Sequence, residues 1–194
     1  METIIYLLSA GIGIILGLIF CIPMFAAYVA KYILEGIALN QMAKSRPVKH
    51  LWLNWIPYAV EYACKNYIFA QMSYEDSFRL FGGRLTFKNK FVPFWIYLGV
   101  YATVMLTSFV SIFLSWIPIL GFIVLAVYLL VVLIGMTVLG FIEFVYLRDF
   151  LNVYKPDQKS NVGTAILLTV LNYPTFGLVR AIYIFRMRND LPLQ

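Results

Sequence analysis

Charge is scarce in this sequence. Charged residues make up only 12 % of the 194 residues, whereas residues of the AVILMFWYC set make up 62 %. Typical soluble domains carry about 25 % charged residues and about 45–50 % apolar residues, even with glycine counted. A soluble fold of this length would need more polar side chains to cover its surface. The composition therefore excludes a soluble globular protein and predicts an integral membrane protein.

Residues that usually carry chemistry are equally few. The chain has one histidine, His50, and two isolated cysteines, Cys21 and Cys64, with no CxxC pair. This spacing supports neither a disulfide nor a metal site. The HExxH, GxSxG, Walker A and GxGxxG motifs are absent from the sequence as well. We therefore expect a non-enzymatic protein with no catalytic residues, no metal and no cofactor.

The basic excess is scattered rather than concentrated. Lys and Arg number 15 against 9 Asp and Glu, which gives a net charge of +6. The basic residues lie in short segments beside apolar runs, as the positive-inside rule and anionic lipids favour. The expected partners are therefore the lipid bilayer and its anionic headgroups, and not nucleic acid.

The first charge-free run covers residues 3–30. A spanning helix needs about 20 apolar residues, so this run predicts a first transmembrane helix. The only charge before it is Glu2, whereas Lys31 and further basic residues follow, which places the N-terminus outside. Gly13 and Gly17 form a GxxxG motif, which indicates a helix–helix contact, with a homodimer as one option.

The second charge-free run covers residues 91–142 and must fold back once. As one helix it would measure about 78 Å, more than twice the hydrocarbon thickness. The sequence Ser-Trp-Ile-Pro at 115–118 supplies the break, because proline cannot continue the helix. We expect transmembrane helices at 91–116 and 118–147, joined by an outside turn that carries no Lys or Arg.

Small residues recur at every fourth position along the first of these two helices. Such a ridge favours close packing against another helix, and the alternative is a polar path for a solute. Its members are Gly99, Thr103, Thr107 and Ser111.

Between the two charge-free runs, residues 44–90 are mixed in character. Apolar residues recur at helical spacing after Pro57, while Glu61 and Lys65 lie on other faces as an i,i+4 ion pair. We expect an interfacial amphipathic helix on the cytoplasmic side. Its aromatic residues form a candidate partner surface, or alternatively an ordinary aromatic belt. They are Trp52, Trp55, Tyr58, Tyr62 and Tyr67.

The last apolar stretch, residues 162–185, leaves two alternatives open. Asn172-Tyr173-Pro174 interrupts its middle. The stretch is either a fourth transmembrane helix or a re-entrant hairpin with both ends in the cytoplasm. Glu143 and Arg180 are the candidate intramembrane polar pair. We favour a shallow position for both, with Arg180 reaching the interface, over a buried pair that closes the base of the bundle.

Residues 43–57 read Ala-Lys-Ser-Arg-Pro-Val-Lys-His-Leu-Trp-Leu-Asn-Trp-Ile-Pro. This stretch resembles a family of small integral membrane proteins of Gram-positive anaerobes, in which a basic stretch ending Lys-His precedes Trp-Leu-Ala-Trp-Ile-Pro. Here Asn54 replaces the alanine, and Pro47 stands where a glycine is usual. The resemblance implies a bacterial plasma membrane and brings no activity with it.

The sequence therefore predicts an all-α, polytopic helical membrane protein that forms one domain. Three functions stay open. The first is an interaction or accessory subunit that binds a membrane-protein partner or a peptide. The second is a transport-related protein, either a solute-binding subunit or a dimeric transporter, and the third is a lipid-directed enzyme resting on His50 and the nearby basic residues. An apolar cavity with buried, convergent polar groups would favour transport. A filled bundle with an exposed apolar groove would favour the interaction subunit.

Overall fold

The computed structural model describes residues 2–46, 48–57, 61–73, 77–80, 85–89, 91–114, 116–117, 120–155 and 161–191. Within these ranges the chain is almost entirely helical. The elements in order are α1 (Glu2–Met42), η1 (Ala43–Ser45), η2 (Leu51–Trp55), α2 (Glu61–Met72), β1 (Phe78–Leu80), β2 (Leu85–Phe87), α3 (Val92–Leu114), α4 (Leu120–Tyr154), α5 (Asn161–Asn172) and α6 (Leu178–Arg186). Strands β1 and β2 pair antiparallel, with Phe78 opposite Phe87.

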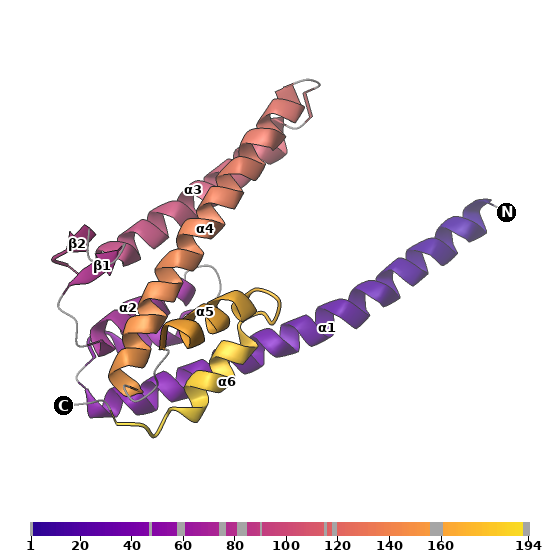
Figure 1. The fold of residues 1–194 in the computed structure, drawn as a ribbon. Coiled ribbons are helices and arrows are strands. Elements are labelled where there is room, and N and C mark those ends of the chain that lie inside the picture. The colour runs from indigo at the N-terminus through magenta and orange to yellow at the C-terminus, as the bar shows by residue number, and fades with distance from the viewer. Residues whose placement is uncertain are drawn as a thin grey trace.

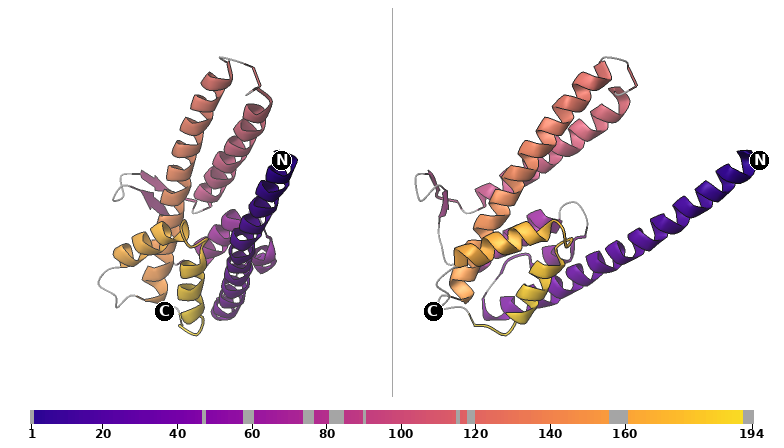
Figure 2. Two further views of the ribbon diagram at one scale, coloured as in Figure 1. Left: turned by 90° about the vertical axis from the view of Figure 1, so that its right-hand side faces the viewer. Right: turned by 45° about the vertical axis from the view of Figure 1, so that its right-hand side comes forward.

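The molecule consists of a base from which two arms diverge (Figures 1 and 2). The first arm is residues 2–26 of α1. The hairpin arm is α3 with residues 120–141 of α4, packed antiparallel. The base contains the remainder of α1 and α4 together with α2, α5 and α6. Buried apolar side chains concentrate in the base, where Phe69 of α2 packs edge-on against Phe150 of α4 at 4.8 Å between ring centroids.

Three helices in the described ranges are long and apolar enough to cross a membrane: Ile19–Ser45, Phe94–Leu114 and Gly121–Tyr154. Large exposed apolar side chains lie on the hairpin arm and on residues 19–25 of the first arm, which suits lipid contact. The predicted all-α polytopic class is confirmed. The break near 115–118 is confirmed too, because α3 ends at Leu114 and α4 begins at Leu120. Ser115 and Pro118 lie outside the described residues.

Two helices extend beyond their predicted ends. Helix α1 continues from residue 30 to Met42, and α4 continues from residue 147 to Tyr154. Charged residues at these ends suggested the edge of the membrane. In the structure Lys31, Glu35 and Asp149 are buried in the base instead. Pairing inside the protein allows charged side chains to remain on a buried helix.

The prediction of an amphipathic helix with a solvated polar face is wrong for α2. Glu61 and Lys65 are each only 1 % exposed, and Asn66 is buried as well. Their polar groups face other helices of the base, so α2 belongs to the core. Trp52 and Trp55, which precede α2, are exposed.

The last apolar stretch is broken where the sequence predicts. Helix α5 ends at Asn172, a turn follows, and α6 begins at Leu178. Gly177 takes a positive φ of 82°, which glycine adopts without strain. At about 1.5 Å per residue neither short helix spans a bilayer alone. The two helices contact each other and the base, which fits the hairpin alternative.

The first half of the small-residue ridge on α3, Gly99 and Thr103, does not pack against another helix in the described part of the chain. Gly99 and Thr103 are exposed, and a Cβ on Gly99 would meet no atom within 4 Å. The hydroxyl of Thr103 donates to the Gly99 carbonyl at 2.9 Å, and that of Thr107 donates to the Thr103 carbonyl at 2.7 Å. Because these hydroxyls bond their own helix, nothing requires a partner helix there.

Helix α3 contacts α4 through a different set of residues. Val100 and Val104 approach Gly135, whereas Ser111 on the ridge is half-buried. In the first arm a Cβ on Gly17 would also meet no atom within 4 Å, and the side-chain surroundings of Gly13 lie outside the described part. The homodimer suggested by the GxxxG motif stays a prediction.

Two glycines make a matched test of the packing between η2 and α1. A Cβ on Gly36 would lie 2.7 Å from Cζ3 of Trp55. Alanine in place of a helical glycine normally adds about 0.5–1 kcal/mol of stability, and we expect that gain for Gly99→Ala. For Gly36→Ala we expect a net loss, because overpacking costs about 1–3 kcal/mol. Denaturant titration in detergent measures both free energies of unfolding, and equal gains would contradict this packing.

Candidate functional site

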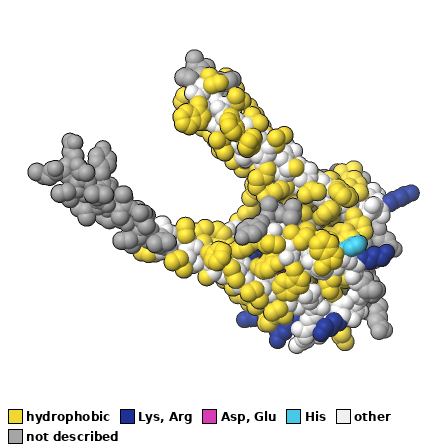
Figure 3. All heavy atoms as spheres, turned by 180° about the vertical axis from the view of Figure 1, so that it is seen from behind, with side chains coloured by type: hydrophobic (Ala, Val, Ile, Leu, Met, Phe, Trp, Pro, Cys, Tyr) yellow, Lys and Arg dark blue, Asp and Glu magenta, His cyan; other side chains and the backbone are white. Residues whose placement is uncertain are grey.

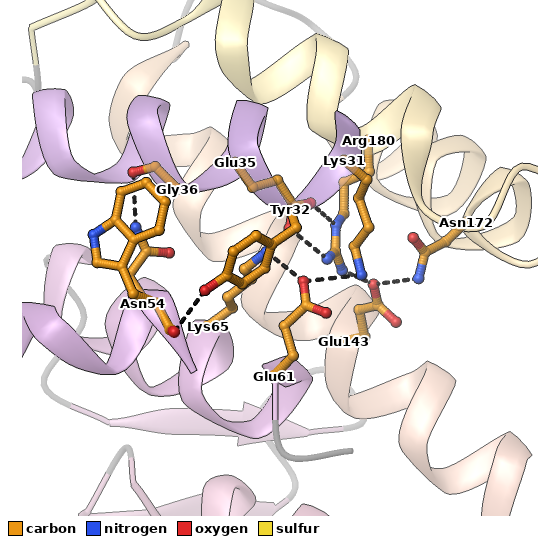
Figure 4. A network of polar contacts seen from close by, with 11 residues as sticks. Lys31, Tyr32, Glu35, Gly36, Asn54, Glu61, Lys65, Glu143, Asn172 and Arg180 are labelled. Atoms are coloured by element: carbon orange, nitrogen blue, oxygen red, sulfur yellow. Dashed lines mark hydrogen bonds and ion pairs between the residues drawn. The ribbon is translucent and has the colours of Figure 1, made fainter. Parts of the chain in front are cut away.

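Six of the buried charged side chains in the described part of the base, from four helices, contact one another. Each is at most 5 % exposed. Three are carboxylates and three are cations, so their formal charges balance. They form one connected network (Figure 4). Its members are Lys31 and Glu35 of α1, Glu61 and Lys65 of α2, Glu143 of α4 and Arg180 of α6.

Arg180 joins two of the carboxylates. Its Nε donates to Glu35 Oε1 at 2.7 Å, and its Nη2 donates to Glu35 Oε2 at 3.2 Å. Its Nη1 donates to Glu143 Oε1. Two bonds to one carboxylate fix the plane of the guanidinium as well as its position. Arg180 thereby ties α6 to both α1 and α4.

The two lysines join the third carboxylate. Lys65 Nζ lies 2.5 Å from Glu35 Oε2 and 2.5 Å from Glu61 Oε1. Lys31 Nζ lies 3.0 Å from Glu61 Oε1. The predicted i,i+4 pair of Glu61 and Lys65 is therefore confirmed, although it is buried rather than solvated.

An aromatic ring contacts two of the cations. Lys31 Nζ lies 4.2 Å from the centroid of the Tyr62 ring, and the Arg180 guanidinium carbon lies 5.0 Å from it. These distances suit cation–π attraction. Burial raises the pKa of the Tyr62 hydroxyl above its ordinary value, so the ring stays neutral at physiological pH.

The predicted Glu143–Arg180 pair exists, and its favoured shallow position is wrong. Arg180 is fully buried, because the turn after α5 brings α6 back against α1. There Arg180 finds Glu35 as a second carboxylate. Lys31 and Glu35 were not among the predicted site residues. Their signal was an i,i+4 Lys–Glu spacing at the end of an apolar helix, which mirrors Glu61 and Lys65.

The residues of the predicted aromatic surface do not form one continuous exposed surface, because they differ in exposure. Trp52 and Trp55 are exposed, whereas Tyr62 and Tyr67 are half-buried. Tyr67 packs against Phe91 at 4.9 Å and Phe94 at 5.6 Å between ring centroids. Tyr58 lies outside the described residues.

A cavity of about 320 Å³ lies beside the network, where the hairpin arm meets the base. Its walls are mostly aromatic and aliphatic, and Glu143 and Asn172 add polar groups. The lining residues are Tyr62, Tyr97, Tyr101, Val104, Met136, Leu139, Glu143, Asn172, Tyr173 and Phe176.

Glu143 belongs to both the network and the cavity. Its contacts with described residues both run to Oε1, which accepts from Arg180 Nη1 and, at 2.9 Å, from Asn172 Nδ2. Neither contact engages Oε2. Tyr173 donates its hydroxyl to the Met136 carbonyl at 3.4 Å. The hydroxyls of Tyr62, Tyr97 and Tyr101 form no hydrogen bond with any residue the structure describes. The cavity lining thus includes a carboxylate whose Oε2 takes part in neither contact, together with tyrosines whose hydroxyls are not bonded to described residues.

Other candidate residues lie apart from this cavity. His50 is exposed in the turn before η2 and does not line the cavity. No group of three or more His, Cys, Asp or Glu in the described ranges is placed to hold a metal ion. Both cysteines are free, Cys21 exposed and Cys64 buried.

No family model, curated protein or solved structure matches the chain.

Proposed function

We propose that this chain is a solute-binding membrane protein with a transport-related role, and that the tyrosine-lined cavity is its binding site. The observation that carries the proposal is a partly enclosed apolar cavity on which buried polar groups converge. Small-molecule sites commonly have volumes of about 300–1,000 Å³, apolar walls and a few fixed polar groups. This cavity has all three features.

The ionic network gives Glu143 a fixed position in this proposal. Arg180 and Asn172 hold Oε1, and Arg180 is itself held by Glu35. With Oε1 held in this way, Glu143 keeps a defined position in the cavity wall, which favours specific binding. The break between α5 and α6 supplies Asn172, Tyr173 and Phe176 to the same cavity. Interrupted helices beside a binding site are a feature of transporters.

Filling the cavity is the test of this function. Val104 lines the cavity, whereas Leu106 lies on the exposed face of the same helix. We expect a small molecule to co-purify with the wild-type protein and with Leu106→Trp, and to be lost from Val104→Trp. Mass spectrometry of extracts from protein purified out of native membranes measures this. Equal amounts in all three proteins, or none in the wild type, would contradict the proposal.

The proposed location is a bacterial plasma membrane, with the N-terminus and the 116–117 turn outside. Exposed Lys and Arg side chains lie at the end of the molecule away from the arms (Figure 3), and this distribution supports a cytoplasmic base. Lys88, between β2 and α3, is exposed. In intact cells we expect Lys88→Cys to react with an impermeant thiol reagent only after lysis. Reaction before lysis would reverse the orientation.

An interaction subunit is the second candidate, favoured by the exposed indoles of Trp52 and Trp55. Aromatic side chains are enriched at the centres of binding surfaces. In that case Trp52→Phe would reduce recovery of a stoichiometric membrane partner, while insertion of the protein stayed normal. Unchanged recovery would remove this candidate and leave the cavity proposal untouched.

A further inference from the structure

We propose that the occupant of the cavity is a lipid-like amphipath with an ammonium head and a single alkyl chain, which enters from the bilayer. This inference rests on the proposed function, because it names the class of molecule that the same cavity takes. Three observations carry it: the level of the cavity in the molecule, the position of its rim, and the charge of its lining.

The cavity lies at the level of the membrane spans. Tyr97, Tyr101 and Val104 belong to the span Phe94–Leu114, and Met136 and Leu139 belong to the span Gly121–Tyr154. With Glu143, six of the ten lining residues therefore come from helices that can span the membrane. A site at this level is reached from the hydrocarbon region or its boundary.

The rim of the cavity is part of the lipid-facing surface. Met136, Tyr173 and Phe176 line the cavity, yet each is 42–45 % exposed. The opening is thus lateral, between the hairpin arm and the turn that joins α5 to α6. A water-soluble molecule would have to cross apolar surface to reach it, whereas a molecule dissolved in the bilayer meets it directly.

The lining selects the charge of the head. Glu143 is the charged residue among the described lining, and the lining includes no Lys, Arg or His. The nearest cation, Arg180, is already bound by Glu35 and Glu143. A carboxylate or phosphate head would therefore bring a second negative charge beside Glu143. An ammonium head would instead donate to Glu143 Oε2 and lie against tyrosine rings, which attract cations.

The apolar part of the lining suits the alkyl chain of the ligand. Val104, Met136, Leu139 and Phe176 offer apolar surface that continues onto the outside of the hairpin arm. At about 320 Å³ the cavity is near the lower end of the range for drug-sized ligands. This size favours one alkyl chain over a two-chain phospholipid.

Photo-crosslinking in nanodiscs tests the proposal on the full-length protein. The probes are a long-chain alkylamine and the fatty acid of equal length, each with a diazirine in mid-chain. We expect the amine to label α3 and α4 peptides that line the cavity about tenfold more than the acid, as a charged hydrogen bond in a buried site allows. Val104→Trp should abolish this labelling and Leu106→Trp should keep it. Glu143→Gln, checked for folding, should bring amine and acid close to equal labelling.

A competition experiment on the wild-type protein keeps the test independent of variants. Unlabelled long-chain amine should displace the probe, whereas the short, water-soluble butylammonium ion at equal concentration should not. Acid labelling equal to amine labelling would overturn the ammonium head, and equal competition by butylammonium would overturn the alkyl chain. If neither probe labels the cavity while Val104→Trp still loses a co-purifying molecule, the ligand class is wrong and the proposed function stands. If neither probe labels the cavity and Val104→Trp loses no co-purifying molecule, both the ligand class and the proposed function are contradicted.

Discussion

Replacing Arg180 with methionine is expected to lower the free energy of unfolding by about 3–5 kcal/mol, the typical cost of removing one partner from a buried ion pair. Methionine fills much of the same space but leaves Glu35 and Glu143 without their shared cation. Glu35 retains Lys65 at 2.5 Å, whereas Glu143 retains only the Asn172 amide. Denaturant titration of the protein in detergent micelles measures the loss.

Arg188→Met is the matched control for this substitution. Arg188 is half-buried, donates to the Phe185 carbonyl at 3.0 Å and stacks on the Phe185 ring. A surface arginine of this kind contributes about 1 kcal/mol or less. Equal costs for the two variants would show that Arg180 does not hold a buried network.

A charge swap between Glu143 and Arg180 is a poor test of their pairing. A carboxylate at position 180 would face Glu35, which Arg180 contacts through two bonds. The doubly reversed protein would therefore remain destabilised even though the pair exists. Charge-removing substitutions avoid this new repulsion.

The second large effect is expected for Lys65→Met, which should also lower the free energy of unfolding by about 3–5 kcal/mol. Lys65 lies between Glu35 and Glu61 at 2.5 Å from each. Removing it leaves the described network with three carboxylates and two cations. Adding Glu61→Gln restores equal numbers, so the double variant should lose less stability than the sum of the single variants.

A double-mutant cycle measures this coupling. Contacting ionic residues usually show interaction energies of about 0.5–3 kcal/mol. We expect the interaction energy between Lys65→Met and Glu61→Gln to fall within this range. Simple addition of the two single losses would contradict a shared buried network. Trp52 is exposed and takes no part in the ionic network, so the losses from Lys65→Met and Trp52→Phe should add.

The arms could be predicted from sequence because the bilayer restricts the choice of structure. A spanning segment must satisfy its own backbone hydrogen bonds, so a long charge-free run becomes a helix. The run 91–142 is too long for one crossing, and Pro118 indicated where it would turn. These inferences need no knowledge of distant contacts.

The network could be predicted only in fragments, because spacing shows which residues share a face but not what that face meets. Glu61 and Lys65 have the same i,i+4 spacing whether they face water or a protein interior. Their partners Lys31 and Glu35 lie far earlier in the sequence, just beyond residue 30, where the first helix was predicted to end. Burial of α2 depends on those partners, and so its spacing alone did not show that its polar residues are buried.

The cavity left an even weaker signal. Tyr97 and Tyr101 sit in a charge-free run among many aromatic residues, and lipid-facing aromatics look the same in sequence. The interruption at Asn172 and Pro174 was visible in the sequence. The helices against which the chain packs on either side of it could not be predicted. Packing of α5 against α4 brings Asn172 beside Glu143, and the turn after α5 adds Tyr173 and Phe176 to the cavity wall.

The most direct test of the account is on which side of the membrane the two ends of the stretch 162–185 lie. Both the network and the cavity require the chain to turn back between α5 and α6. Val162 and Arg186 are exposed near those ends, and Trp116 is 86 % exposed at the tip of the hairpin arm. Single cysteines at these positions, in a protein whose Cys21 and Cys64 are replaced by alanine, can be labelled with an impermeant thiol reagent in oriented vesicles. We expect Val162→Cys and Arg186→Cys to react from the same side of the membrane and Trp116→Cys from the other. Reaction of positions 162 and 186 from opposite sides would show a spanning segment and contradict the fold of the site.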